Sequence, residues 1–304
     1  AIGFFATSAV VVTLGARPVF CDVNDSMQMD PSKIASLITP RTVALAPTHW
    51  SGGVCDMAAI LRVARKHRLK VIEDCAQAPG AKYRGRYVGT MGDIGCFSIS
   101  CYKIIGGGEG GMVLTDDQRL FERAMQFAEC GGLWRGAQRF APPRYKGELF
   151  CGSNYRMSEL EAAVDVVQLG KLDDVVRRFH ANHMRIRSRL GSFRKVRLQK
   201  MNDAKGEVGY HFRLFPENIA LGRKLVESLC AAGVACGMRA PNPAPDWHIG
   251  SEMFPLREHM PSKDACPVAE DLFNRCLTLS INQWWTANDC RRIADAIHRV
   301  LTAL

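Results

Sequence analysis

Short apolar runs alternate with stretches of helical periodicity over about the first 117 residues of the chain. Residues 56–67 have this periodicity, with Met57, Ile60, Leu61 and Val63 on one face. Strands that are joined by such crossover helices predict a mostly parallel sheet with helices on both faces, an α/β fold. The apolar runs that predict strands lie at residues 18–23, 43–47, 71–72, 95–101 and 112–114.

The middle of the chain is predicted to be helical. Residues 120–130 predict one helix, and a loop-rich excursion follows over residues 131–152. A long helix is predicted from near Met157, because Ser158 and Glu161 have the spacing of a capping box. The apolar face of this long helix includes Leu160, Val164, Val167 and Leu172.

Beyond Arg194 the pattern changes to short segments, which indicates a second, smaller domain of the α+β type. We expect a large domain over residues 1–175 and a small C-terminal domain over residues 176–304. The short segments are a run at 209–215, helices at 221–232 and 287–301, and a proline-rich loop at 241–245.

The composition narrows the class of protein. Hydrophobic residues make up 47% of the chain and charged residues 23%, as in soluble globular proteins. The twelve cysteines are irregularly spaced and form no CxxC, which favours a reduced, cytoplasmic protein over a disulfide framework. The net charge of +10 favours an anionic substrate such as a nucleotide-linked sugar, or it is simply a solvated surface. Lys and Arg are scattered, so no nucleic-acid partner is predicted.

The start of the chain is apolar over its first sixteen residues, but this run is too short to span a bilayer. It also lacks the basic leading region of a signal peptide, so no membrane partner is predicted. The chain begins with alanine at what reads as the middle of a domain. We therefore expect the first domain to be incomplete at its N-terminus.

Candidate chemistry lies at the ends of two predicted strands. Asp74 follows the strand at 71–72, and Lys103 follows the strand at 95–101 and precedes a glycine-rich run. Ligands of parallel sheets bind at the carboxyl ends of the strands. A lysine amine can hold the aldehyde of pyridoxal phosphate and move protons, while a carboxylate stabilises the protonated ring nitrogen. Ser98 can donate its hydroxyl to the phosphate.

Each of these residues also has a structural interpretation. A lysine beside glycines is often only part of a turn, and Asp74 or Glu73 can cap the turn that follows the strand. His180 and His183 stand three residues apart on a predicted helix, but no third ligand is evident and solvated helix positions explain them better. No metal is therefore predicted.

Taken together, the motifs resemble those of the DegT/DnrJ/EryC1/StrS aminotransferases, fold-type I pyridoxal-phosphate enzymes that mostly aminate keto sugars or keto-cyclitols. The resemblance covers nearly the whole chain and is strongest from Phe4 to Gly111. It rests on Phe4-Phe5-Ala6-Thr7, on His49-Trp50-Ser51-Gly52 (similar to the family's His-Leu-Tyr-Gly), on Glu73-Asp74-Cys75-Ala76-Gln77, on Phe97-Ser98 through Lys103 to Gly111, and on Asn154-Tyr155-Arg156-Met157.

The resemblance implies a role for each matching residue. It implies a cytoplasmic homodimer with a keto substrate and an amino-acid donor, which acts in the biosynthesis of sugars, cyclitols, antibiotics or polysaccharides. The implied roles are stacking on the pyridine ring for Phe4, pairing with the ring nitrogen for Asp74, contact with the ring hydroxyl for Gln77, the phosphate for Ser98, catalysis for Lys103, the phosphate of the partner subunit's site for Asn154, and a place near the substrate for His49 and Tyr102.

Two departures from the family pattern leave an alternative open. Lys103 favours transamination over the dehydration that members with histidine at this place perform. However, Cys101-Tyr102 stands where the family has Pro-Thr or Asn, and the family's Gly-Thr-x-Ala-Leu phosphate loop would precede Ala1. The main hypothesis is an aminotransferase that uses glutamate or glutamine. The alternative is a catalytically inactive relative with a regulatory or scaffold role.

Overall fold

The computed structural model describes residues 1–132, 150–239 and 245–303. Its first sheet has the strand order β1-β2-β5-β6, formed by β1 (Ala44–Leu45), β2 (Lys70–Asp74), β5 (Ile94–Ser98) and β6 (Gly111–Leu114). The first three strands are parallel, whereas β6 runs antiparallel to β5. Residues 99–110 connect β5 to β6 through glycine-rich turns and contain no crossover helix, and the chain returns antiparallel.

Helix α3 (Met57–His67) makes the crossover between β1 and β2. The Asp56 carboxylate caps it by accepting a hydrogen bond from the Ala59 N–H at 3.2 Å. Its predicted apolar face packs into the core through Met57 and Ile60, which are fully buried. The small hairpin of β3 (Lys82–Tyr83) and β4 (Arg86–Tyr87) follows β2.

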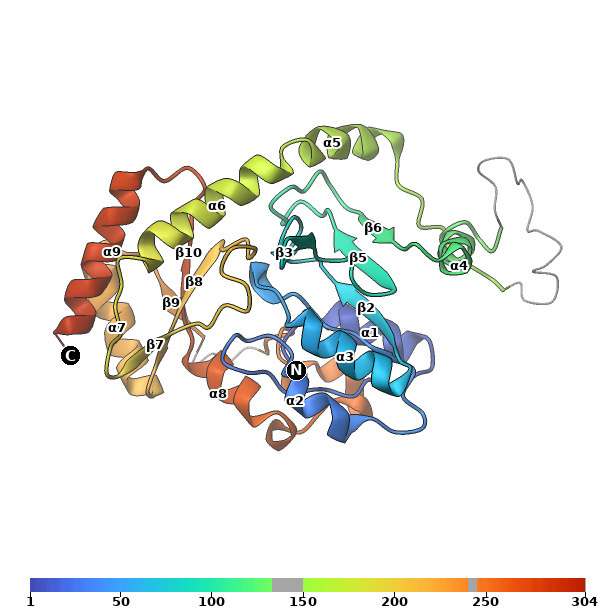
Figure 1. Ribbon diagram of the computed structural model, residues 1–304, viewed down its shortest axis with the longest axis horizontal. Helices are drawn as coiled ribbons and strands as arrows, with labels where there is room; N and C mark the ends of the chain where they lie inside the picture. The colour runs from blue at the N-terminus through green and yellow to red at the C-terminus, as the bar shows by residue number, and fades with distance from the viewer. Residues whose placement is uncertain (133–149, 240–244, 304) are drawn as a thin grey trace.

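The second sheet is antiparallel throughout its described strands, with the order β7-β8-β10-β9. Strand β8 alternates, so that Phe212 and Leu214 enter a core while His211 and Arg213 face the other side. Helices cover the core face of this sheet (Figure 1). The elements are β7 (Val196–Leu198), β8 (His211–Pro216), β9 (Gly237–Met238), β10 (Leu277–Ser280), α6 (Leu172–Arg187), α7 (Ile219–Ala231) and α9 (Ala287–Thr302).

A third cluster joins the beginning of the chain to its last third. Ile2, Val23 and Trp50 pack there against Phe215 and Leu272. The helical elements of these two parts of the chain are α1 (Phe5–Thr13), α2 (Pro31–Ile34) and α8 (Pro267–Arg275), with 3-10 turns η1 (Ala35–Leu37), η2 (Trp50–Gly52), η4 (Gly250–Glu252), η5 (Phe254–His259) and η6 (Lys263–Ala265).

The strand predicted at 18–23 is wrong. Only Val23 of this segment makes a β-bridge, an isolated one to Met29. Asp22 instead accepts hydrogen bonds from the N–H groups of Val268 (3.1 Å) and Ala269 (2.9 Å), at the start of α8. A capping contact to a helix so distant in the sequence replaces the sheet ladder.

Helices α4 (Gln118–Ala128) and α5 (Glu159–Leu169) match the helices predicted from 120 and from near 157. The Ser158 hydroxyl caps α5 as predicted, accepting from the Glu161 N–H at 3.2 Å. Together α5 and α6 form a long arm that connects the two sheets (Figure 1). Most of the predicted loop at 131–152 and of the proline-rich loop at 241–245 lies outside the described residues. Of the helices described, none has the length and apolar character needed to cross a membrane.

Candidate active site

A cavity of about 790 Å³ lies between connections that follow the strands of the first sheet and one face of the second sheet. The first part of the chain contributes Ser51, Gln77 and Lys103 to its wall. The second sheet contributes the face of β8 and β10 that does not enter the core. The side chains on that face are His211, Arg213, Cys276, Thr278 and Ser280.

Lys103 reaches this cavity from a tight turn after β5. Its N–H donates to the Ser100 carbonyl at 2.9 Å, and its own carbonyl accepts from the Gly106 N–H at 3.1 Å. A Cβ atom at Gly106 would lie 2.0 Å from the Ser100 carbonyl oxygen, so only glycine fits. Gly106 therefore allows the backbone to pass close to Ser100, and the resulting turn places Lys103 at the cavity wall.

Asp74 is the last residue of β2, and neighbouring hydroxyls and an amide hold its carboxylate. Oδ2 accepts hydrogen bonds from Thr7 Oγ1 (2.5 Å) and Thr48 Oγ1 (3.3 Å). Oδ1 accepts from the Ala76 N–H at 3.0 Å. Sequence reasoning assigned no role to the two threonines, although Thr7 belongs to the Phe4–Thr7 segment and Thr48 precedes His49.

Gln77 is fixed from both of its ends. Its Oε1 accepts a hydrogen bond from the Ser51 N–H at 3.1 Å, and its carbonyl accepts from the Tyr210 hydroxyl at 2.8 Å. Ser51 has a φ of 56°, in the left-handed region that serine rarely adopts. This conformation lets the Ser51 N–H contact Gln77 while its hydroxyl points to the second sheet, at 2.6 Å from His211 Nδ1.

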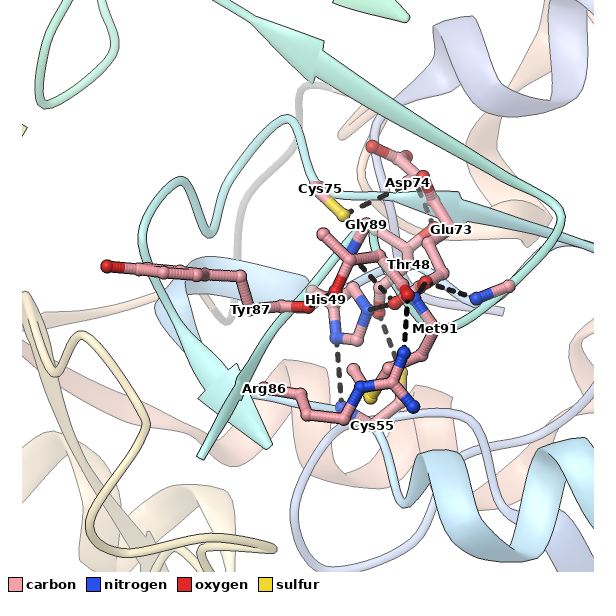
Figure 2. Close-up of polar contacts among 12 residues, drawn as sticks. Thr48, His49, Cys55, Glu73, Asp74, Cys75, Arg86, Tyr87, Gly89 and Met91 are labelled. Atoms are coloured by element: carbon pink, nitrogen blue, oxygen red, sulfur yellow. Dashed lines mark hydrogen bonds and ion pairs between the residues drawn. The ribbon is translucent and has the colours of Figure 1, made fainter. Parts of the chain in front are cut away.

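His49 lies apart from the cavity, in a buried network around Glu73 (Figure 2). Glu73 Oε1 accepts from the N–H groups of Met91 (2.7 Å) and Gly92 (2.6 Å). Its Oε2 accepts from the Gly89 N–H at 2.9 Å and lies 3.1 Å from His49 Nε2. Because His49 Nδ1 accepts from the Cys55 N–H, the ring proton belongs on Nε2, which donates to Glu73.

The same network explains the charge state of Glu73 and excludes a metal. Burial raises the pKa of the Glu73 carboxyl, but the hydrogen bonds from His49, Gly92 and Gly89 outweigh it and lower that pKa below its ordinary value. The ligand atoms of His49, Glu73 and Cys75 lie within 4.8 Å of one another. The ring nitrogens and the carboxylate are already hydrogen-bonded, and burial raises the pKa of the Cys75 thiol, so we assign no metal here.

The other predicted residues are distributed in and around the cavity. Tyr102 lines it, whereas the Phe4 ring is half exposed and faces His248 at 5.4 Å between ring centroids. Ser98 Oγ accepts from the Ser100 N–H at 3.4 Å. Asn154 is exposed and lies outside the cavity of its own chain, with Oδ1 accepting from the Arg156 N–H at 3.2 Å.

The two histidines of α6 do not face one another. His180 Nδ1 contacts the Glu207 carbonyl at 2.8 Å, and His183 Nδ1 contacts the Gly209 carbonyl at 3.2 Å. His183 is buried, so the expectation that both are solvated is wrong for this residue. Burial lowers the pKa of His183 to about 4.

The donor set of the cavity and of the strand end beside it fits pyridoxal phosphate. The Lys103 amine and the Gln77 amide line the cavity and match the aldehyde and the ring hydroxyl of that cofactor. The Asp74 carboxylate, oriented by two hydroxyls and bonded to the N–H of the cavity-lining Ala76, matches the ring nitrogen, although Asp74 itself is not part of the cavity wall. Lysine and carboxylate follow adjacent parallel strands, as expected for ligands of an α/β sheet. Fold and site thus define the class of pyridoxal-phosphate enzymes.

The chain belongs to the DegT/DnrJ/EryC1/StrS aminotransferase family, whose model matches residues 1–298. It is 34% identical to a UDP-N-acetyl-3-dehydro-alpha-D-glucosamine 3-aminotransferase of Acidithiobacillus ferrooxidans, over 98% of this chain and 75% of that protein. It is 38% identical to the L-glutamine:2-deoxy-scyllo-inosose aminotransferase of Streptomyces kanamyceticus, over 59% of this chain and 43% of that protein.

A solved structure confirms the fold. The X-ray structure of an aminotransferase from Psychrobacter cryohalolentis superimposes with a TM-score of 0.81 and 27% identity, covering 99% of this chain and 80% of that one. The predicted family, the fold-type I architecture and the pyridoxal-phosphate aminotransferase class are therefore confirmed.

Proposed function

We propose that this protein moves an amino group from glutamate or glutamine to the ketone of a sugar, often nucleotide-linked, or of a cyclitol. The observation that carries the proposal is Lys103 in one cavity with Gln77, together with the Asp74 carboxylate that ends the adjacent parallel strand and is held by Thr7 and Thr48. The two relatives described above act on an amino-sugar precursor and a cyclitol, as their names say. Such a reaction serves the biosynthesis of polysaccharides or antibiotics.

Pyridoxal phosphate supplies an electron sink when it is bound. Lys103 would hold its aldehyde and, once released, move a proton at the substrate carbon, a role that typically contributes roughly 10²- to 10⁴-fold in rate. Asp74 would face the ring nitrogen, oriented by the hydroxyls of Thr7 and Thr48. Gln77 would approach the ring hydroxyl.

The remaining predicted contacts are part of the same proposal. Ser98 would donate its hydroxyl to the phosphate, and Phe4 would stack on the ring. His49 would not contact the cofactor. It would position Asp74, because its hydrogen bond to Glu73 helps to fix the end of β2 on which Asp74 lies. Tyr102, at the cavity wall, would contact the substrate.

We also propose that the protein works as a cytoplasmic homodimer. Asn154 is exposed outside its own cavity, which suits a residue that completes the site of a second copy. Helix α5 exposes apolar side chains on its surface, among them Leu160 (83% exposed) and Val166 (72% exposed). All twelve cysteines are free thiols, which supports a reducing compartment.

Covalent trapping tests the role of Lys103. Purified protein is incubated with pyridoxal phosphate, reduced with borohydride, digested and mapped by mass spectrometry. We expect the pyridoxyl group on the peptide that contains Lys103, and its loss in Lys103→Ala together with aminotransferase turnover. Lys171→Ala, which removes an exposed lysine outside the cavity, is the matched control and should retain the label. Absence of a label on wild-type Lys103 would contradict the proposal and favour the inactive relative.

A further inference from the structure

Two arginines among the described residues line the cavity, and they differ in how their charge is compensated. The Arg239 guanidinium forms an ion pair with Glu252 through Nη2, and its Nε lies 3.6 Å from Asp246 Oδ2. Arg213 has no carboxylate within ion-pair distance among residues 1–132, 150–239 and 245–303. Only 6% of Arg213 is exposed, so water does little to screen this charge.

The polar groups around Arg213 are neutral. Its Nη2 donates to Ser51 Oγ at 2.6 Å, and the Ser51 hydroxyl in turn contacts His211 Nδ1 at 2.6 Å. Burial, followed by the charge of Arg213, lowers the pKa of His211 to about 3, so this imidazole carries no charge near neutral pH. Burial also raises the pKa of Tyr210 to about 12 and raises the pKa of the Cys276 thiol.

Arg213 occupies the cavity face of its sheet because of the strand period. It lies opposite Thr278 in the register of β8 and β10, and both side chains line the cavity. A buried charge without a partner is costly, and an anion in the cavity would remove that cost.

We propose that Arg213 binds the carboxylate of the amino donor. This rests on the proposed function, which brings an amino acid into the cavity with Lys103. One uncompensated guanidinium matches the single charge of a carboxylate, and its fork geometry suits two parallel N–H···O bonds. A diphosphate carries more charge than one arginine neutralises, and the second arginine of the cavity is already paired.

The test measures binding rather than turnover. The affinity of the pyridoxal-phosphate-loaded protein for glutarate, a dicarboxylate with no amine to transfer, is determined by calorimetry for wild type and Arg213→Gln. Pyrophosphate serves as the probe for the phosphate of a nucleotide-linked substrate. Arg213→Lys keeps the charge without the fork, and Arg223→Gln removes an equal charge from an exposed position outside the cavity.

We expect Arg213→Gln to weaken glutarate binding about ten- to hundredfold. Arg213→Lys should recover part of the loss, and Arg223→Gln should bind like wild type. Weakened pyrophosphate binding with unchanged glutarate binding would overturn the assignment in favour of a phosphate. No glutarate binding by the wild type, or equal affinity in Arg213→Gln, would overturn it outright. Glutarate is titrated into the cofactor-free protein as well, so that a failure of the lysine-trapping experiment and a failure of the Arg213 assignment are read separately.

A stability measurement separates ligand binding from a structural role. Arg213→Met removes an uncompensated buried charge, so we expect the ligand-free variant to unfold at a temperature equal to or higher than wild type. Added glutarate should raise the unfolding temperature of wild type but not of this variant. A marked fall in the unfolding temperature of the ligand-free variant would show that Arg213 serves packing instead.

Discussion

At the scale of single residues, Glu73 organises the end of β2. Its two carboxylate oxygens accept hydrogen bonds from three backbone N–H groups and from the imidazole of His49. The backbone segment 89–92 is thereby fixed to the strand that carries Asp74. A fully buried carboxylate with this many donors acts as a structural anion, and the geometry of the neighbouring Asp74 depends on it.

Replacing Glu73 by Gln tests this dependence. The amide keeps the shape but turns one acceptor into a donor that faces N–H groups, so we expect a loss of about 2 kcal/mol in the free energy of unfolding. Urea denaturation measures the loss. Glu227→Gln, at an exposed position of α7, is the control and should unfold like wild type. A change at Glu73 as small as that of the control would show that the network contributes little.

At the scale of elements, α6 is fastened to the segment before β8 by buried titratable groups. His180 and His183 contact the carbonyls of Glu207 and Gly209. Burial raises the pKa of Glu207 to about 8, against weaker lowering by backbone hydrogen bonds. The folded protein therefore holds a proton that the unfolded chain releases near its ordinary pKa, and the resulting stability is present at low pH and lost as pH rises to about 8.

Glu207→Gln removes this dependence, because glutamine stays neutral at every pH. Relative to wild type, the variant should therefore be more stable at about pH 9 than at about pH 6. The difference in the free energy of unfolding, variant minus wild type, should be more positive at the higher pH by at least about 1 kcal/mol. Chemical denaturation at the two pH values measures the difference. A difference that does not change with pH would mean that Glu207 is charged in the folded protein.

The pH dependence should have the opposite sign on the acid side. The pKa of His183, lowered by burial, keeps it neutral in the folded protein while the unfolded chain takes up a proton below its ordinary pKa. This group therefore destabilises the fold as pH falls from about 6.5 toward about 4. The two ranges overlap, and within the overlap the two contributions cancel, so Glu207 and His183 together place the greatest stability between about pH 4.5 and about pH 6.5.

At the scale of the whole molecule, the arm formed by α5 and α6 leaves α5 without a covering layer (Figure 1). The apolar face predicted for this helix is present, but its residues at 160, 164 and 167 are exposed rather than part of a core. Helix α4, which precedes α5 in the chain, exposes Phe121 and Phe127 as well. Apolar surface of this kind indicates a protein partner, and the proposed second copy is the one that would also bring in Asn154.

Light scattering on Val166→Glu tests the dimer. A charge on the exposed side of α5 should dissociate the proposed dimer into monomers while the circular dichroism spectrum stays unchanged, since Val166 packs in no core. The matched control is Ile219→Glu on α7, far from α5 in Figure 1, which should leave the dimer intact. A wild-type protein that is monomeric at all concentrations would contradict the shared site.

Local patterns predicted the parts of the fold that local physics decides. The strand ends that carry Asp74 and Lys103, and the Ser158 cap of α5, follow from periodicity and residue type. The fate of Asp22 was not predictable in this way, since its partners lie in α8. Helix α1 was not predicted either, because no residue of its apolar sequence is buried in a core that would fix its period.

The second half of the cavity was missed, although a signal for it exists. Polar and apolar residues alternate in His211-Phe212-Arg213-Leu214. This pattern indicates a strand with one face in a core and the other face toward solvent or a polar cavity. The alternation does not predict that the polar face lines the same cavity as Lys103, because that depends on how the second sheet packs against the first part of the chain. The division into domains at 175/176 stays a prediction.

The alternation in β8 and β10 also separates two selective pressures. Phe212, Leu214, Leu277 and Leu279 face the core, while the positions between them face the cavity. Mutations at the cavity positions would change the groups that the proposed site offers to a ligand and leave the core volume untouched, so single substitutions there should carry little risk to folding. One face of the sheet thus maintains the core while the other can change its side chains one residue at a time.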